Sequence, residues 1–256
     1  MKLNIVTIVL NGQPYISQHL KMLQSLAIDW HWWIVEGVAA PVADTFWIQK
    51  QDPGLSTDGT TEYLDSIDDP RVTVIRSSLW GGGKTEMVNA PLPMIKKESV
   101  LLQMDSDEFW TKEQLERMVD MFEKNFRIMA MQFYADYRVG PNIRITSNNT
   151  YGNKWNEWVR AWRFRPTMLF NSHEPPVLNN GRGYMMNRDE TREAGLVFLH
   201  QAYTTENQLR FKERVYNYKN AYYQWKMLQD NTEWPIKQLN QWLPWVGDGV
   251  TADKIL

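Results

Sequence analysis

Apolar runs rich in β-branched residues alternate with helix-type patterns along the first half of the chain. In the helix-type segments the apolar residues recur at three- and four-residue spacings, which places them on one helix face. Pro91 and Pro93 should kink or split one of these helices. The alternation predicts an α/β fold with a mixed, mainly parallel sheet and helices on both faces. We predict strands at residues 4–10, 32–35, 72–75, 100–104 and 128–134, and helices at residues 14–26, 58–67, 84–96 and 111–124.

The second half of the chain carries an aromatic and arginine-rich segment at residues 151–170. Trp155, Trp158 and Trp162 would share one face if this segment were helical. Tryptophan stacks on sugar rings and bases, so these residues could line a binding cleft, but a stripe buried in the core explains them equally well.

A short strand at residues 196–199 and a long helix at residues 205–228 follow. Thr205 and Gln208 form a capping-box pattern at the start of that helix. Residues 229–256 are rich in Trp and Pro and show no clear period, so we describe them as a helical or aromatic C-terminal extension. This tail could pack on the domain, pair with another chain or touch a membrane.

Composition narrows the classes of function. The net charge of −2 gives no basic surface for nucleic acid and no polybasic patch for an acidic membrane. We therefore predict no nucleic-acid partner. Cysteine is absent, which excludes disulfides, thiol catalysis and Cys-ligated zinc and fits a reducing compartment, so we predict a cytoplasmic protein. The apolar part of the N-terminus is short and lacks a small-residue cleavage site, so it indicates a strand instead of a signal peptide.

The glycine-rich stretch SSLWGGGKTEM at residues 77–87 is partly similar to a phosphate-binding P-loop. Gly83-Lys84-Thr85 matches the end of that motif, but its first glycine would have to stand at the position of Ser78. We therefore interpret the stretch as a strand-to-helix turn, with Lys84 near an anion.

Ligands of open α/β sheets sit at the carboxyl ends of the strands. Asp105 and Asp107 follow the predicted strand at residues 100–104 and point to the same side if the chain stays extended. Two such carboxylates suit a hard divalent cation, Mg²⁺ or Mn²⁺. The alternative is a solvated acidic turn that caps the next helix. The other polar or glycine-rich strand ends are Asn11-Gly12, Glu36-Gly37 and residues 80–83.

The four histidines differ in their surroundings. His19 and His31 lie in or beside regular elements, which favours surface or structural roles. His173 and His200 fall in irregular segments after predicted strands, where sites are built. An imidazole from either could complete a carboxylate metal site.

The order and spacing of several motifs resemble a family 2-type glycosyltransferase with the GT-A fold. The similarity covers most of residues 1–228, and its last motifs resemble a subgroup with DxDE, HE and HxGY signatures. The segments that carry the resemblance are IVTIVLNGQPYI, IVEG, STDGTTEYL, DPRVTVI with GGGKTEMVNAPL, LLQMDSDEFW, His173-Glu174, and FLHQAY with the lysine-bearing helix after it.

This resemblance implies metal-dependent, inverting transfer of a sugar from a nucleotide-diphosphate sugar of the UDP or GDP type to a hydroxyl acceptor such as a glycan. The cofactor would be Mn²⁺ or Mg²⁺. Residues 1–228 would form the GT-A domain, with the nucleotide-sugar half at 1–108 and the acceptor half at 109–228, followed by the tail at 229–256. The implied nucleotide-sugar contacts are Asn11, Glu36, Lys84 and Asp105, and the implied metal ligands are Asp105, Asp107 and His200.

An inverting reaction also needs a base near the acceptor hydroxyl. The resemblance assigns that role to Glu174, with Asp136 and Glu157 as alternatives, and makes Asp107 the second catalytic residue. For Glu174, a salt bridge to a nearby arginine is the competing explanation. The acceptor contacts would be Trp155, Trp158 and His173.

The chain also departs from the family pattern. Glu36 stands where the family usually has Asp, about twenty residues (38–56) separate it from the Ser-Thr-Asp turn, and Gln201-Ala202 precedes Tyr203. Two other classes of function therefore stay open. A nucleotidyltransferase would use a similar sheet and carboxylates to make a nucleotide-sugar. A non-catalytic sugar-binding protein could retain the same scaffold.

Overall fold

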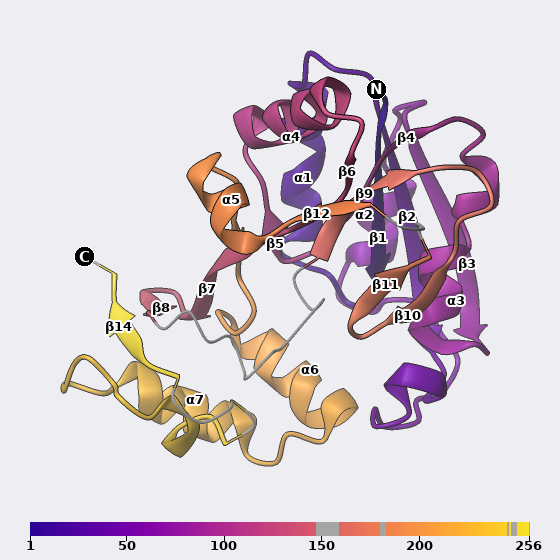
Figure 1. Ribbon diagram of the computed structural model, residues 1–256. Helices are drawn as coiled ribbons and strands as arrows, with labels where there is room; N and C mark the ends of the chain where they lie inside the picture. Colours follow the sequence, from indigo (N-terminus) through magenta and orange to yellow (C-terminus); the bar gives the residue numbers. More distant parts are fainter. Residues whose placement is uncertain (147–158, 180–182, 245, 247–249, 256) are drawn as a thin grey trace.

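The computed structural model describes residues 1–146, 159–179, 183–244, 246 and 250–255. Its centre is a seven-stranded sheet with the order β12-β6-β9-β4-β1-β2-β3 (Figure 1). β1 pairs in parallel with β2 and β4, and β2 pairs in parallel with β3, whereas β9 runs antiparallel to β4 and β6. The strands are β1 (Leu3–Val9), β2 (Trp30–Ala39), β3 (Val72–Trp80), β4 (Ser99–Gln103), β6 (Ile128–Gln132), β9 (Val159–Phe164) and β12 (Tyr184–Met186).

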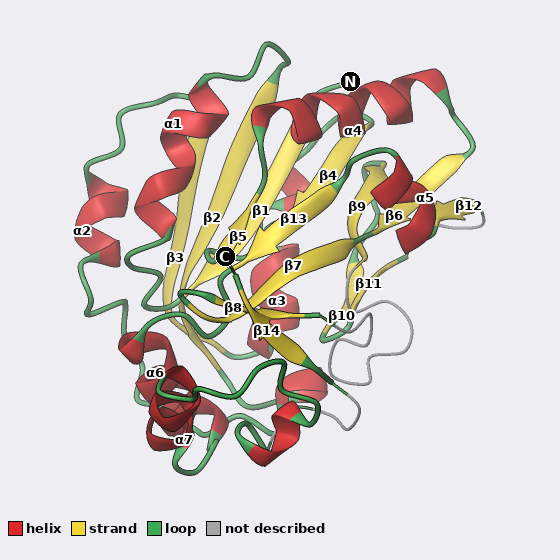
Figure 2. Ribbon diagram, turned by 90° about the vertical axis from the view of Figure 1, so that its left-hand side faces the viewer, coloured by secondary structure: helices red, strands yellow, loops and turns green. Residues whose placement is uncertain are grey.

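Helices cover both faces of this sheet (Figure 2). Leu23 and Phe122 pack in one core cluster with Ile5, whereas Val88 packs in another with Val6. Because neighbouring residues of a strand point to opposite faces, these clusters mark the two sides of β1. Helices α1, α2 and α4 belong to the first side and α3 to the second. Their bounds are α1 (His19–Gln24), α2 (Thr60–Asp65), α3 (Gly83–Asn89) and α4 (Lys112–Lys124).

A second, five-stranded sheet has the order β14-β8-β7-β13-β5, and a hairpin joins β10 to β11. These elements, the remaining helices and the 3-10 turns complete the described fold. They are β5 (Glu108–Phe109), β7 (Tyr134–Gly140), β8 (Ile143–Ile145), β10 (Phe170–His173), β11 (Pro176–Leu178), β13 (Val197–His200), β14 (Ala252–Lys254), α5 (Arg188–Glu193), α6 (Glu206–Tyr216), α7 (Ala221–Gln229), and the 3-10 turns η1 (Ile16–Gln18), η2 (Ala43–Thr45), η3 (Leu92–Met94) and η4 (Leu239–Gln241).

The C-terminal tail packs on the rest of the chain. Ile236, Leu239 and Val250 are buried in the main core cluster, and β14 adds an edge to the second sheet by pairing with β8. Of the fates that the sequence left open for this tail, packing on the domain is the one seen here.

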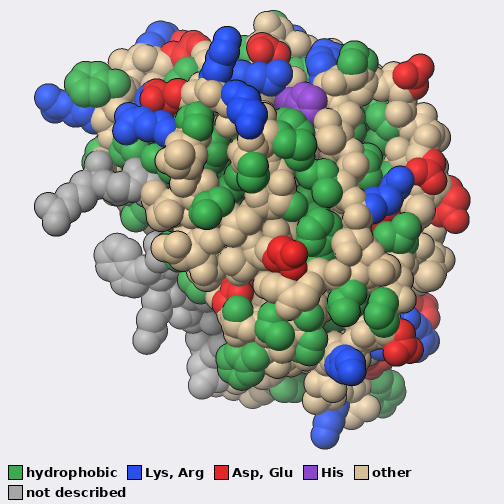
Figure 3. Space-filling view, turned by 90° about the vertical axis from the view of Figure 1, so that its right-hand side faces the viewer, with side chains coloured by type: hydrophobic (Ala, Val, Ile, Leu, Met, Phe, Trp, Pro, Cys, Tyr) green, Lys and Arg blue, Asp and Glu red, His purple; other side chains and the backbone are tan. Residues whose placement is uncertain are grey.

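β3 is the edge strand of the large sheet. The face of the molecule on that side carries charged side chains of both signs between scattered hydrophobic ones (Figure 3). Charged side chains at a sheet edge disfavour pairing with a strand from another molecule.

The predicted strands of the first half are all confirmed, and the turn after Asn89 splits the predicted proline-containing helix into α3 and η3. The capping boxes at Thr111 and Thr205 are present, each with both of its hydrogen bonds.

The structure differs from the helical alternative for the aromatic segment and from the single long helix predicted at residues 205–228. Residues 159–164 form strand β9 with every side chain buried, so Trp162 is a core residue and not part of a helical face; Trp155 and Trp158 lie outside the described residues. The helix predicted at residues 205–228 is two helices, because Asn217 and Asn220 adopt left-handed conformations with φ of 55° and 60°. Asparagine tolerates this region better than other side chains do.

Candidate functional site

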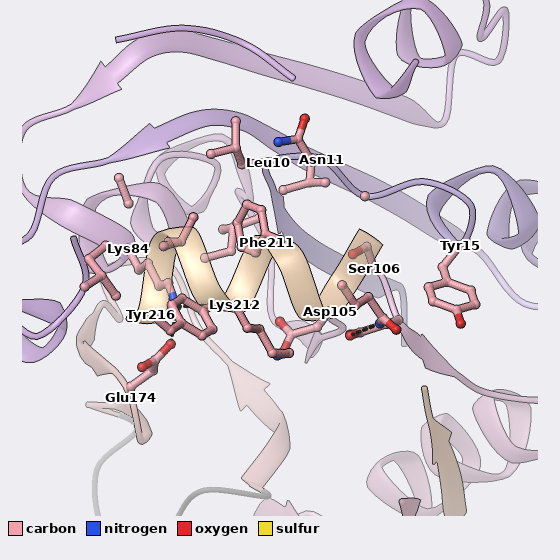
Figure 4. A pocket seen from close by; sticks show the side chains of 18 of the residues that line it. Leu10, Asn11, Tyr15, Lys84, Asp105, Ser106, Glu174, Phe211, Lys212 and Tyr216 are labelled. Carbon is pink, nitrogen blue, oxygen red and sulfur yellow. Dashed lines mark hydrogen bonds and ion pairs between the residues drawn. The ribbon is translucent and has the colours of Figure 1, made fainter. Parts of the chain in front are cut away.

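A cavity of about 1120 Å³ opens where β1, β2 and β4 end. This is the edge at which parallel sheets bind ligands. Helix α6 forms the opposite wall, so Phe211, Lys212 and Tyr216 face the strand ends that carry Asn11 and Asp105 (Figure 4). The cavity is therefore lined by both halves of the chain.

One corner of the cavity is built from the turn after β1 and the Ser-Thr-Asp turn. Asn11 Oδ1 accepts the Thr57 N–H at 2.8 Å, and Asp58 Oδ2 accepts the Gln13 N–H at 2.9 Å. Asn11 has a φ of 58°, which turns the chain sharply at the strand end. The residue predicted to contact the nucleoside thus lines the cavity, and its side chain also locks the two turns together.

Glu36 does not take the predicted place in the nucleotide site. Strand β2 continues to Ala39, so Glu36 lies inside the strand, fully buried. Its carboxylate accepts hydrogen bonds from Arg76 Nε at 2.8 Å and Thr61 Oγ1 at 2.5 Å. Burial alone would raise the pKa of Glu36, but these hydrogen bonds lower it below its ordinary value. Glu36 Oε1 also accepts the Ser56 N–H at 3.3 Å, so Glu36 anchors α2 and the turn before it to the sheet.

The acidic turn after β4 lines the cavity. Asp107 Oδ1 is 3.5 Å from His200 Nε2, and Asp107 Oδ2 accepts a hydrogen bond from Gln208 Nε2 at 3.2 Å. Burial opposes the charge of Asp107, but His200 holds the pKa of Asp107 below its ordinary value. Burial likewise opposes the charge of His200, yet Asp107 raises the pKa of His200. The two predicted residues form a paired acid and imidazole.

Asp105 is held by a different partner. Its Oδ2 atom is 3.3 Å from Arg160 Nη2, and the same guanidinium binds the fully buried Glu108 at 2.8 Å. Arg160 comes from β9, the strand that replaces the predicted helix. Asp105 therefore lines the cavity with one carboxylate oxygen engaged by a buried arginine.

The fit to a divalent metal is partial. No three His, Asp or Glu side chains of the described residues are grouped so that they could hold an ion. Asp105, the predicted third ligand, does not lie close enough to Asp107 and His200 to share an ion with them. Asp107 and His200 can supply two ligands of suitable chemistry. Mg²⁺-type sites often take the rest of their ligands from water and substrate phosphates.

The second predicted group joins Lys84 to Glu174. Lys84 Nζ is ion-paired with Glu174 and 3.3 Å from the Tyr216 hydroxyl. Burial by itself would raise the pKa of Glu174, but the charge of Lys84 outweighs it and holds this pKa well below the usual range. The competing explanation for Glu174, a salt bridge, is thus realised with a lysine. Lys84 therefore pairs with Glu174 beside Tyr216, the last residue of α6 (Figure 4).

Asp44, which sequence reasoning missed, fixes the backbone at the His-Glu pair. Its Oδ2 atom accepts the N–H of His173 at 2.6 Å and of Glu174 at 2.7 Å, while Oδ1 accepts the Thr85 hydroxyl at 2.8 Å. Asp44 lies in η2, inside the insertion at residues 38–56. His173 is buried, with Nε2 3.1 Å from the Gln103 amide nitrogen. Its Nδ1 lies 3.6 Å from Glu174 Oε1, so it packs against the Glu174 carboxylate.

The sequence analysis did not single out two other residues of the wall, although the helix that bears Lys212 was one of the segments that carry the family resemblance. Trp47 from the insertion and Lys212 from α6 both line the cavity. Of the alternatives for the base, Asp136 pairs with Arg138 and Arg144 and is not among the residues that line the cavity, whereas Glu157 lies outside the described residues. No signal in the sequence distinguished Asp44 or Trp47 from ordinary loop residues.

The sequence model described as glycosyl transferase family 2 matches residues 54–192, more than half of the chain. The chain belongs to glycosyl transferase family 2. The match spans the acidic turn, β9 and Glu174, so these parts of the cavity wall lie within the matched residues. No curated protein sequence matches this family 2 chain significantly.

The solved structures that match the chain include TarS and a mannosyltransferase. TarS of S. aureus (residues 1–349) is 16% identical, with a TM-score of 0.42, over 64% of this chain and 47% of that one. The same fragment in complex with UDP-GlcNAc is 16% identical, with a TM-score of 0.46, over 73% of this chain and 59% of that one. Mannosyltransferase PcManGT from Pyrobaculum calidifontis, in complex with GDP-Man and Mn²⁺, is 12% identical, with a TM-score of 0.50, over 90% and 65%.

The chain thus spans about half to two thirds of the length of these solved chains. The likeness to the mannosyltransferase concerns the fold, and it agrees with the predicted GT-A architecture. Within the described residues, no helix has the length and apolar character needed to cross a membrane.

Proposed function

We propose that the protein transfers a sugar from a nucleotide-diphosphate sugar to an acceptor hydroxyl, with inversion at the anomeric carbon. The observation that carries the proposal is the cavity itself. At the carboxyl ends of parallel strands it places the Asp107–His200 pair on one wall and the Glu174 carboxylate on another. Family membership supports this proposal, as does the shared fold of a mannosyltransferase that was solved with GDP-Man and Mn²⁺.

In the proposed reaction the acceptor oxygen forms a bond to the anomeric carbon. The bond from that carbon to the diphosphate oxygen breaks, and its electron pair leaves with the nucleoside diphosphate. The acceptor proton passes to Glu174. A single displacement of this kind inverts the anomeric configuration and needs a base on the face opposite the leaving group.

Different residues of the cavity would bind different parts of the donor. The corner formed by Asn11, Thr57 and Asp58 would hold the nucleoside, and Asp105, oriented by Arg160, would face the ribose. Asp107 and His200 would hold a divalent cation, which when bound neutralises charge on the departing diphosphate. Gln208 keeps Asp107 in its orientation, because it donates a hydrogen bond to the second carboxylate oxygen.

Glu174 is the proposed base because its carboxylate lines the cavity near Lys84 and Tyr216, apart from the acidic turn (Figure 4). Lys84 keeps Glu174 ionised at neutral pH, so the carboxylate is in the form that accepts a proton. Its lowered pKa makes it a weak base, and the proton transfer would therefore lag behind bond formation to the anomeric carbon.

The test is donor turnover by the purified chain. UDP-, GDP-, CDP- and dTDP-sugars, each with Mn²⁺, Mg²⁺ or EDTA, are incubated with and without sugar acceptors, and released nucleoside diphosphate is measured. We expect release with one nucleotide class, lost in Asp107→Asn and retained in Asp136→Asn, a matched carboxylate outside the cavity. Pyrophosphate release from a nucleoside triphosphate and a sugar phosphate would instead establish a nucleotidyltransferase. Binding of donor without any turnover would establish a sugar-binding protein.

A further inference from the structure

The cations that line the cavity differ in their partners. Lys84 is paired with Glu174, Arg160 with Glu108 and Asp105, and Arg210 with Glu206. Arg214 is exposed to solvent. Lys212 is half-buried, and no carboxylate of the described residues lies within ion-pairing distance of it.

Lys212 is held in the cavity by aromatic rings. Its Nζ lies 4.6 Å from the centroid of Tyr203 and 5.2 Å from that of Tyr216. Cation–π contacts orient an ammonium group without neutralising its charge. The side chain leaves α6 toward the strand end that bears Asp105 (Figure 4). Helix α6 therefore presents a positive charge to the acidic turn.

An unpaired, half-buried ammonium is costly. Burial lowers the pKa of Lys212, and the charge of Asp107 acts in the opposite direction. A lysine with a purely structural role would have a direct counter-ion or would extend its ammonium to water. Lys212 has no direct counter-ion among the described residues and lines the cavity, whereas Lys84 and Arg160 are ion-paired, so an anion bound in the cavity would supply the missing partner.

The acidic turn explains which anion belongs there. A diphosphate placed beside Asp105 and Asp107 meets two like charges, and Lys84 is already used by Glu174. We propose that Lys212 is a further catalytic residue: its ammonium binds the terminal phosphate of the nucleoside diphosphate and stabilises it as the bond to the sugar breaks. This assignment rests on the proposed function.

The assignment has a consequence for metal dependence. Lys212 contributes its charge whether or not Asp107 and His200 hold a cation. The chain should therefore discriminate a nucleoside diphosphate from the monophosphate even in EDTA, because only the diphosphate carries the phosphate that reaches Lys212. A point charge on a flexible stem suits this role.

The experiment is calorimetric titration of UDP, UMP, GDP and GMP into the full chain, in EDTA and in Mn²⁺. The variants are Lys212→Met, Lys212→Gln and Lys212→Arg, with Lys219→Met, an exposed lysine just beyond α6, as the matched control. In EDTA we expect the wild type to bind one diphosphate about tenfold or more tighter than its monophosphate, the yield of one charge-assisted contact. Both neutral variants should lose that preference while keeping monophosphate affinity, and Lys212→Arg should retain most of it.

Turnover of the donor gives the second readout. Removal of a charge that acts on the transition state costs about a hundredfold or more in kcat, so Lys212→Met should lose that much with Mn²⁺ present. If either folded neutral variant keeps the wild-type preference for diphosphate, the assignment of Lys212 is overturned while the proposed function stands. If the wild type binds neither diphosphate in either buffer and also releases no nucleoside diphosphate from CDP- or dTDP-sugars, the proposed function fails, and the assignment of Lys212 with it.

Discussion

Replacement of Lys84 by Met isolates the ion pair at the base end of the cavity. Lys84 has 13% of its side chain exposed and Glu174 has 31%, so the variant leaves a partly buried carboxylate without its counter-ion. Truncation of one partner in a desolvated pair costs about 2–5 kcal/mol. Because water still reaches part of Glu174, we expect the lower part of that range, about 2–3 kcal/mol.

The loss should be visible as a lower melting temperature. For a chain of this size about 1 kcal/mol corresponds to roughly 2–4 °C, so Lys84→Met should melt about 4–12 °C below the wild type at neutral pH. Calorimetry or circular dichroism measures this directly. In Glu174→Gln/Lys84→Met the uncompensated charge is gone, so the double variant should be more stable than Lys84→Met alone.

The pH dependence gives the sharper check. In the wild type the folded pKa of Glu174 lies below its ordinary value of 4.5. The stability that Glu174 contributes is therefore present above that value and is lost as the pH falls toward the lowered pKa. In Lys84→Met, burial acts without the lysine and raises the pKa of Glu174, so protonation stabilises the variant. The difference in melting temperature should narrow as the pH falls from about 7 to about 4. A difference that does not change with pH would refute the ion-pair reasoning.

Three further changes test the scaffold. Gly37→Ala should destabilise the chain by about 3 kcal/mol, because φ is 137° and the new Cβ would lie 1.8 Å from the carbonyl oxygen of Ser77; Gly81→Ala, where a Cβ meets nothing within 4 Å, should leave the urea midpoint unchanged. Asn217→Ala should lower the free energy of unfolding by about 1 kcal/mol in the same assay, because a φ of 55° is unfavourable for alanine. Asn217→Gly should lower it less, and equal effects would contradict the left-handed turn. Asp44→Ala removes the acceptor of two part-buried N–H groups and should lower the melting temperature by roughly 4–10 °C as well as donor turnover. Full turnover would show that the His-Glu backbone does not need this anchor.

The parts of the fold that local pattern determines were predicted from the sequence. Both tested capping boxes are made by side chains a few residues apart, and apolar periodicity placed the strands of the first half. Strand β9 was missed because it lies between β4 and β6 with both faces covered. A strand in that position shows no alternation, and tryptophans spaced like a helical stripe then dominate the pattern.

The site shows the same limit. The acidic turn, His200 and Glu174 were identified because they stand in recognisable motifs. Glu36 was misplaced because its strand continues past Val35, which turns a predicted strand-end acid into a buried anchor. Asp44 gains its position only from contacts with a distant segment, and such contacts leave no short-range mark in a single sequence. The helix that bears Lys212 was part of the family resemblance, but the contacts of Lys212 with Tyr203 and Tyr216 were not predicted.

The anchor at Asp44 bears on how this scaffold can be recombined. One carboxylate from the loop after β2 holds two consecutive backbone N–H groups more than a hundred residues away. An engineered chimera that exchanges the acceptor-side hairpin between family members would leave that carboxylate facing a foreign backbone. Grafts on this scaffold should therefore transfer residues 38–56 together with the β10–β11 hairpin, because the two segments form one exchangeable unit although they are far apart along the chain.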